Sequence, residues 1–135
     1  MKDSEPEGSF RVLIENNNCS LATGDDLAIA ADRDVVGTAQ TAVFIRSNTL
    51  ASTSQESIDL YADDIDLCAD ITGNIVSANM LFEDDGSGSL RVEQFSAATG
   101  GPLSSLNTFI GSTVVEANGD GNDVIPVVEG ACGTP

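Results

Sequence analysis

Histidine and tryptophan are absent from this 135-residue sequence, and lysine occurs once, as Lys2. Without histidine the chain lacks the commonest general base and the commonest nitrogen ligand of metal ions. A serine or cysteine nucleophile has no histidine partner here, and no glycine-rich phosphate loop with a lysine is present. The sequence carries no catalytic signature, so we expect a protein that is not an enzyme.

Positive charge is also scarce, because five Lys and Arg stand against 22 Asp and Glu and leave a formal net charge of −17. Arg11, Arg33, Arg46 and Arg91 occur singly among acidic residues, whereas a nucleic-acid surface requires a basic patch. No run approaches the roughly 18 apolar residues that a membrane-spanning helix needs. We therefore expect neither nucleic acid nor a membrane as a partner.

The acidic residues are spread along the chain, which indicates a solvated surface on a folded domain. Short carboxylate side chains with almost no lysine hold a hydration shell in concentrated salt, where the Debye length falls to about 3 Å and self-repulsion is screened. In composition the chain resembles proteins of extremely halophilic archaea and their viruses. An ordinary acidic secreted or surface protein is the alternative.

Aromatic residues are limited to five Phe and one Tyr, so the core has to consist of Val, Ile, Leu and Ala. A small core of this kind favours oligomerisation. Cys19, Cys68 and Cys132 are too few and too far apart for a disulfide scaffold or a zinc site. Buried free thiols are the expected state, and one disulfide with a spare cysteine is the alternative.

The first nine residues are polar and acidic and lack the apolar stretch of a signal peptide. They predict a flexible acidic N-terminal arm at residues 1–9, followed by a single β-rich domain at residues 10–135. A protein made and assembled in the cytoplasm is the simpler expectation, and a removed leader is the alternative.

Short runs rich in β-branched residues recur at roughly ten-residue spacing, separated by Asn, Asp and Gly turns. This pattern predicts an all-β fold, a small antiparallel β-sandwich or barrel with hairpins. The expected strands are residues 10–14, 42–46, 58–62, 65–71, 74–82, 90–95, 108–115 and 124–128.

Residues 74–95 contain the clearest hairpin signal. An alternating stretch enters the turn Asp84-Asp85-Gly86-Ser87-Gly88 and returns through residues 90–95. A second hairpin is expected to join residues 108–115 to 124–128 through the turn at 118–123. Pro126 indicates that the last strand is an edge or carries a bulge.

One internal repeat is visible, IDLYADD from Ile58 followed by IDLCADI from Ile65. Read as strands, its apolar residues change face at Asp63-Asp64, which predicts a bulge or a tight corner. Read as a helix, residues 56–71 have heptad-like spacing, with a capping box between Thr53 and Glu56. Isoleucine and aspartate are poor helix formers, so strands are favoured.

The most metal-like stretch is residues 118–123, where carboxylate and amide oxygens stand on a glycine-rich loop that suits Ca²⁺ or Mg²⁺. The candidate ligands are Asn118, Asp120, Asn122 and Asp123. The loop lacks the bidentate Glu of an EF-hand, and a simple hairpin turn is the competing interpretation. No other cofactor is expected.

Adjacent carboxylates occur at Asp25-Asp26, Asp63-Asp64 and Asp84-Asp85. A glycosidase needs two such groups converging across a cleft, with aromatic side chains that stack on the sugar. The scarcity of aromatic residues argues against this activity.

The phrase GNIVSANM, from Gly73 to Met80, resembles segments of β-rich tail and fibre proteins of tailed viruses. Together with the halophilic composition, the resemblance implies a non-enzymatic virion structural protein of a haloarchaeal tailed virus. A capsid decoration (cement) subunit fits best, assembled in the host cytoplasm. Its expected partners are copies of itself, with a trimer favoured, and other virion proteins such as the major capsid protein.

Two alternatives remain at this point. One is a tail-tube, fibre or turret subunit of the same virion. The other is a secreted halophilic cell-surface module with a calcium-binding loop, located outside the cell.

Overall fold

The computed structural model describes residues 10–20, 23–32, 40–51, 55–96, 102–111, 115–119 and 124–135. Its secondary structure is almost entirely β-strand, so the predicted all-β class is confirmed. All pairs between its strands are parallel, and the predicted antiparallel sandwich or barrel is therefore wrong.

The strands form three parallel sheets, which we call A, B and C. In order across the sheet, sheet A contains β1 (Phe10–Glu15), β3 (Gln40–Arg46), β6 (Asp66–Thr72), β9 (Ser89–Glu93) and β12 (Ile125–Val127). Sheet B contains β10 (Thr108–Phe109), β7 (Ile75–Val76) and β4 (Thr49–Leu50). Sheet C contains β11 (Val115–Gly119), β8 (Met80–Asp85), β5 (Ile58–Asp63) and β2 (Ala28–Asp32). One short helix, α1 (Leu103–Leu106), lies between β9 and β10 in the chain.

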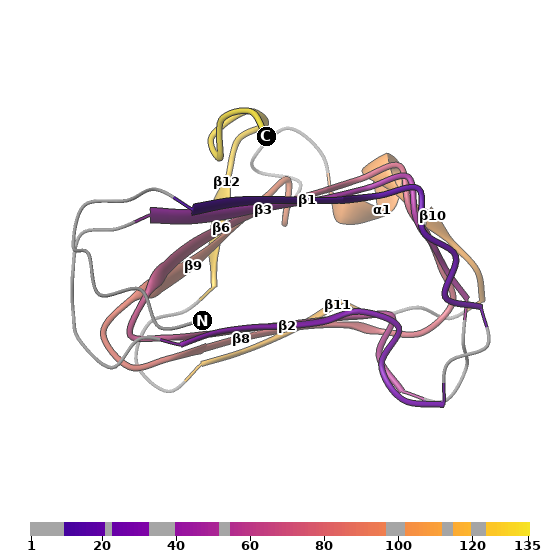
Figure 1. Ribbon diagram of the computed structural model, residues 1–135, viewed down its shortest axis with the longest axis horizontal. Helices are drawn as coiled ribbons and strands as arrows, with labels where there is room; N and C mark the ends of the chain where they lie inside the picture. The colour runs from indigo at the N-terminus through magenta and orange to yellow at the C-terminus, as the bar shows by residue number, and fades with distance from the viewer. Residues whose placement is uncertain are drawn as a thin grey trace.

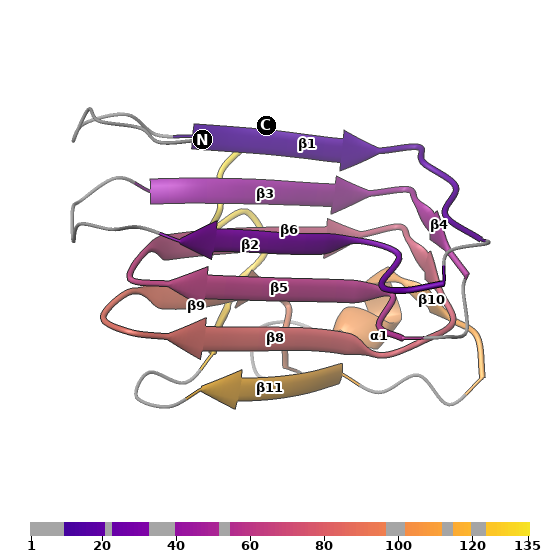
Figure 2. The ribbon, with the colours of Figure 1, turned by 60° about the horizontal axis from the view of Figure 1, so that its bottom comes forward.

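The chain passes from sheet A through sheet B to sheet C and then returns, so each circuit is one coil of a parallel β-solenoid. Coil 1 holds β1 and β2, coil 2 holds β3 to β5, coil 3 holds β6 to β8, coil 4 holds β9 to β11, and β12 begins the next coil. Sheets A and C face each other as two layers, and sheet B closes one side (Figure 1). The strands of sheet A and those of sheet C point in opposite directions (Figure 2).

Both predicted hairpins are wrong, because their strands lie in different sheets. β8 belongs to sheet C and β9 to sheet A, so the turn between them is a corner of the solenoid. At this corner Gly86 has a φ of 80°, and a Cβ on Gly88 would lie 2.1 Å from the carbonyl oxygen of Ile65. Likewise β11 pairs with β8, while β12 pairs with β9.

Three local predictions are confirmed. Residues 56–71 contain the strands β5 and β6 rather than a helix. The change of face at Asp63-Asp64 is a tight corner, where Asp64 has a φ of 54°. Pro126 lies in β12, an edge strand of sheet A, where the missing N–H removes no hydrogen bond from an inner strand pair.

The core lies between the sheets, because alternate side chains of every long strand point inward. β5 shows the pattern clearly, with buried residues at every second position. Phe82 is fully buried and meets the ring of Phe95 edge-on, with ring centroids 5.8 Å apart. The largest fully buried inward side chains are Ile45, Leu50, Ile58, Leu60, Leu67, Ile71, Met80, Phe82, Leu90 and Leu103.

Four asparagines, Asn17, Asn48, Asn74 and Asn107, stack through successive coils, and the last three directly precede the strands β4, β7 and β10 of sheet B. We call them the asparagine ladder. The side-chain Oδ1 of Asn74 accepts the backbone N–H of Asn48 (2.9 Å), and the Oδ1 of Asn107 accepts that of Asn74 (3.0 Å). Asn17 at the exposed end donates its backbone N–H to Asn48 Oδ1 (2.9 Å). The ladder therefore satisfies backbone groups that the turn removes from the sheets.

The ladder amides also donate to the coil before them. The Nδ2 groups of Asn48, Asn74 and Asn107 donate to the carbonyl oxygens of Ile14, Ile45 and Ile71, at 2.9, 2.8 and 2.9 Å. Three of the ladder residues follow a residue with positive φ: Asn16 (59°), Ser47 (56°) and Gly73 (69°). The same bend thus recurs in three coils, which keeps the strands of sheets A and B in register.

Candidate assembly surfaces

The predicted metal loop falls largely outside the described residues. Asn118 lies in β11, whereas Asp120, Asn122 and Asp123 are not among the residues that the structure describes. The predicted N-terminal arm at residues 1–9 is outside them too. Over the ranges that are described, no group of three or more acidic or cysteine side chains is arranged to hold a metal ion.

The N-terminal end of the solenoid combines exposed apolar side chains with unpaired strand edges. Among the described residues, β1 pairs only with β3, and β2 pairs only with β5, so both have one unpaired edge. Phe10 and Leu13 on β1 are 49% and 43% exposed. The inward residues of coil 1 are packed from one side and are only partly buried: Val12, Ile14, Cys19, Leu27, Ile29 and Ala31.

This end was not predicted from the sequence. The apolar residues of 10–14 were expected to lie in a strand, and β1 confirms the strand. That this strand lies at the edge of sheet A follows only from the order in which the parallel strands pair. An unpaired edge next to exposed apolar side chains is a template for another strand.

The C-terminal end of the solenoid is less suited to pairing. β12 has three residues, and Pro126 at its centre cannot donate a hydrogen bond. Three apolar side chains are exposed at this end, those of Ile110, Ile125 and Val128. At the same end, β11 is a five-residue edge strand of sheet C without proline. Among the described edge strands, the longest is β1 at the N-terminal end, with six residues.

Residues 128–135 form what we call the C-terminal strap, which lies on the outer side of sheet A (Figure 1). A disulfide between Cys68 and Cys132 fixes the strap to β6. Glu93 on β9 accepts the backbone N–H groups of Gly130 (2.9 Å) and Cys132 (2.7 Å). Ala42, Phe44 and the two cysteines form a second, separate apolar cluster.

The expectation of three free thiols is thus wrong, and the alternative of one pair with a spare cysteine holds. Cys19 is the free cysteine and is partly buried against the core. Cys68 and Cys132 are 64 residues apart in sequence, so their spacing gave no sign of the pair. They meet because the strap crosses the outer face of a strand whose alternate residues point outward.

Sheet C carries an acidic outer face. Its outward positions include Asp59 and Asp63 on β5 and Glu83 and Asp85 on β8, and Asp63 and Asp85 are neighbours in register. Asp63 and Asp85 therefore place charge on the outside, whereas Asp84 points inward and is 1% exposed.

The acidic face is crowded enough to perturb one carboxyl group. The pKa of Asp59 is raised from its ordinary 3.8, first by burial and then by the charges of Asp25, Glu83 and Glu56. Asp64 at the corner behaves in the opposite way, because the backbone and side chain of Ser87 donate to its carboxylate (2.8 and 2.9 Å) and lower its pKa.

We expect Asp59→Asn to raise the melting temperature at neutral pH. A raised folded-state pKa means that stability falls as the pH rises from about 3.8 through that pKa, so the neutral amide removes a penalty present at pH 7. The gain should vanish below pH 3.8. Thermal melts at both pH values and constant ionic strength measure it.

Asp64→Asn is the matched control for this experiment. Its lowered pKa stabilises the fold above its ordinary value of 3.8, so the amide should lower the melting temperature at neutral pH and change little in acid. Shifts of the same sign in both variants would contradict the roles assigned to the two groups.

Comparison with known proteins matches no family model to this chain, and neither the curated proteins nor the solved structures contain a significant match. In the part of the chain that is described, no helix is long and apolar enough to cross a membrane. The function therefore has to be inferred from the surfaces of the solenoid.

Proposed function

We propose that this protein is a non-enzymatic structural subunit of a halophilic archaeal virus, of the capsid decoration type, and that it assembles through the N-terminal end of its solenoid. The observation that carries the proposal is the edge of β1 that no described strand pairs with, beside exposed Phe10 and Leu13. A solenoid end of this kind needs a cap to remain soluble. Copies of the same chain supply one.

The inward Val, Ile and Leu residues of β3, β5, β6 and β8 are buried within one chain and are not available for contacts between subunits. The surface left for partners is smaller and is concentrated at the ends of the stack. In this proposal, other virion proteins, including a major capsid protein, bind the faces of the solenoid that contacts between copies of the chain leave open.

Two further observations support the proposed setting. Disulfides persist on virion surfaces and outside cells, so the Cys68–Cys132 bond supports a protein that works beyond the reducing cytoplasm. The acidic outer face of sheet C suits strong salt, in which the repulsion between its carboxylates is screened. The absence of histidine from the whole sequence supports a non-enzymatic role.

The disulfide equally favours the second candidate, a secreted halophilic cell-surface module. That candidate differs in its predicted Ca²⁺ loop at residues 118–123 and in being a monomer. A melting temperature that falls on addition of a chelator, in a protein that sediments as a monomer, would select it over the virion subunit.

We expect Leu13→Glu to reduce the oligomer to a monomer, because a charge at the free edge of β1 blocks strand pairing and apolar burial. Sedimentation velocity in concentrated salt measures the mass of both proteins, and an oligomer is the predicted wild-type state. Lowering the salt should dissociate the wild type too, because hydrophobic contacts weaken while charge repulsion grows.

Ile75→Glu is the matched control, because Ile75 on β7 is also a partly exposed apolar residue, 38% exposed, but lies on sheet B between two neighbouring strands. This variant should keep the wild-type mass. A wild-type protein that is monomeric at every salt concentration would overturn the proposed assembly.

A further inference from the structure

Two arginines that are 80 positions apart lie in one row across the outer face of sheet A. The register of the strands pairs Arg11 with Ala42, Ala42 with Cys68 and Cys68 with Arg91. Three strand spacings separate the two arginines, about 14 Å between their Cα atoms. The two residues between them, Ala42 and Cys68, are small and are buried beneath the strap, with exposures of 7% and 3%.

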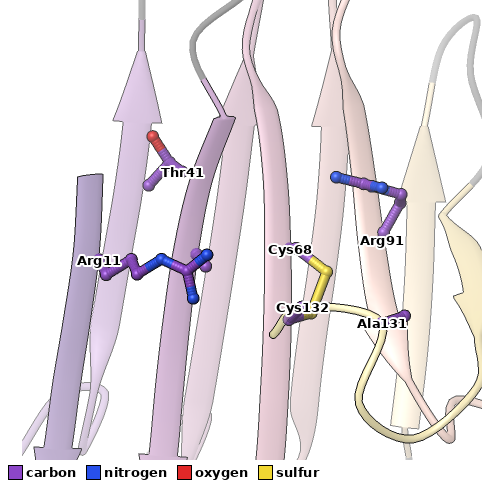
Figure 3. A pocket seen from close by; sticks show the side chains of 7 residues that line it. Arg11, Thr41, Cys68, Arg91, Ala131 and Cys132 are labelled. Atoms are coloured by element: carbon purple, nitrogen blue, oxygen red, sulfur yellow. A yellow bond between two sulfur atoms is a disulfide. The ribbon is translucent and has the colours of Figure 1, made fainter. Parts of the chain in front are cut away.

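The C-terminal strap turns this row into a hollow. Ala131 and Cys132 of the strap line it together with Arg11, Thr41, Ala42, Cys68 and Arg91. The two guanidinium groups extend toward each other from either side of the disulfide (Figure 3). The hollow is small and open on one side, which limits a ligand to a few heavy atoms.

No described carboxylate neutralises this pair. Arg11 donates to the backbone carbonyl of Thr134 in the strap, which positions its guanidinium without cancelling its charge. The Nε of Arg91 is buried and has no hydrogen-bond partner in the described part of the chain.

Three carboxylates on this face form hydrogen bonds or an ion pair with groups other than these two arginines. Glu93 accepts two N–H groups of the strap, and Asp66 accepts the hydroxyl of Ser89 (2.7 Å). Asp70 forms an ion pair with Arg46. The guanidinium group of Arg46 also lies over the ring of Phe44, with its Cζ 5.2 Å from the ring centroid. In a chain with 22 acidic residues, two convergent guanidinium groups that pair with no described carboxylate are therefore an exception, and they present donors suited to an anion.

We propose that this hollow binds a small tetrahedral oxyanion of the phosphate or sulfate type. Each guanidinium presents a planar set of N–H donors that matches oxyanion geometry, and two facing sets contact more oxygens of a tetrahedral ion than of a carboxylate. Because the strap supplies one wall, the bound anion holds the strap against sheet A. The site is independent of the assembly surface at β1 apart from sharing that strand.

The probes are inorganic phosphate, sulfate, acetate and chloride, compared at equal ionic strength in thermal melts and calorimetric titrations. Phosphate and sulfate should raise the melting temperature of the wild type by several degrees at saturation. Acetate and chloride should have a smaller effect. Arg91→Gln should weaken phosphate binding at least tenfold, and the Nε–H resonance of Arg91 should shift with phosphate in the wild type.

Arg46→Gln is the matched control, because it removes the same charge from the same face of sheet A and should retain the phosphate response. Arg11→Gln is a second test of the hollow if Arg91→Gln folds poorly. Equal responses to all four salts, or equal phosphate responses in the wild type and Arg91→Gln, would overturn the site. Sedimentation velocity checks that the wild type and Arg91→Gln are compared at the same oligomeric mass, so neither result depends on the oligomer.

Discussion

Replacing Asn74 by alanine should destabilise the protein by about 4 kcal/mol, a large part of the roughly 5–15 kcal/mol that holds a domain folded. Asn74 is fully buried at the centre of the asparagine ladder. Its side chain serves the backbone N–H of Asn48 and the carbonyl oxygen of Ile45, and alanine leaves both without a partner. Each buried orphan group costs about 1–3 kcal/mol. Chemical denaturation at constant salt measures the loss.

Asn17→Ala is the control, because Asn17 is the exposed end of the same ladder. Its backbone N–H donates to Asn48 Oδ1 and survives the substitution, so we expect a loss below about 1 kcal/mol. Similar losses of unfolding free energy in the two variants would mean that the ladder does not stabilise the turns of the solenoid.

Removing the disulfide with the double substitution Cys68→Ala and Cys132→Ala should destabilise the protein by up to about 4 kcal/mol. The bond joins residues 64 positions apart, and a loop of that length restricts the unfolded chain by roughly this amount. The strap should also open locally and expose Phe44, so binding of an apolar dye is expected to increase. Denaturation curves with and without a reductant measure the effect.

A reductant should lower the stability of the wild type to that of the double variant and leave the double variant unchanged. Cys19→Ala, which removes the partly buried free thiol, is the control and should retain the full response to the reductant. A wild type that is insensitive to the reductant while the bond is shown to be reduced would contradict a stabilising role for the strap.

The positions of the strands were predictable from the sequence, and their pairing was not. Inward and outward residues alternate along a strand in the same way whether its neighbours are parallel or antiparallel. The stretch Asp84 to Gly88 has the composition of a hairpin turn, and that composition also suits a corner that leads to another sheet. Only the face change at Asp63-Asp64 indicated a corner correctly.

A signal for the solenoid was nevertheless present in the sequence. Ile14, Ile45 and Ile71 each precede a ladder asparagine by three residues, with Asn, Ser or Gly in the intervening left-handed position. The spacing of the ladder asparagines varies with the loops, which hides the period from a simple search for repeats. A recurring phrase of apolar residue, turn residue and asparagine predicts stacked coils better than the strand pattern does.

The candidate surfaces were less accessible to sequence analysis. Arg11 and Arg91 were interpreted as single charges in acidic surroundings, and only the register of four strands brings them into one row. The exposure of Phe10 and Leu13 depends on which strand is last in the stack. Such properties follow from the order of strands in a sheet, which local residue patterns do not encode.

The disulfide also determines how the molecule responds to tension. A force applied beyond Cys132 enters the solenoid at β6, in coil 3, because the covalent bond to Cys68 is the shortest mechanical path. Coil 4 and β12 lie within the closed loop and are bypassed by the load. The coils that can be peeled away are therefore those before Cys68, and reduction of one bond would transfer the first rupture to the opposite end of the stack.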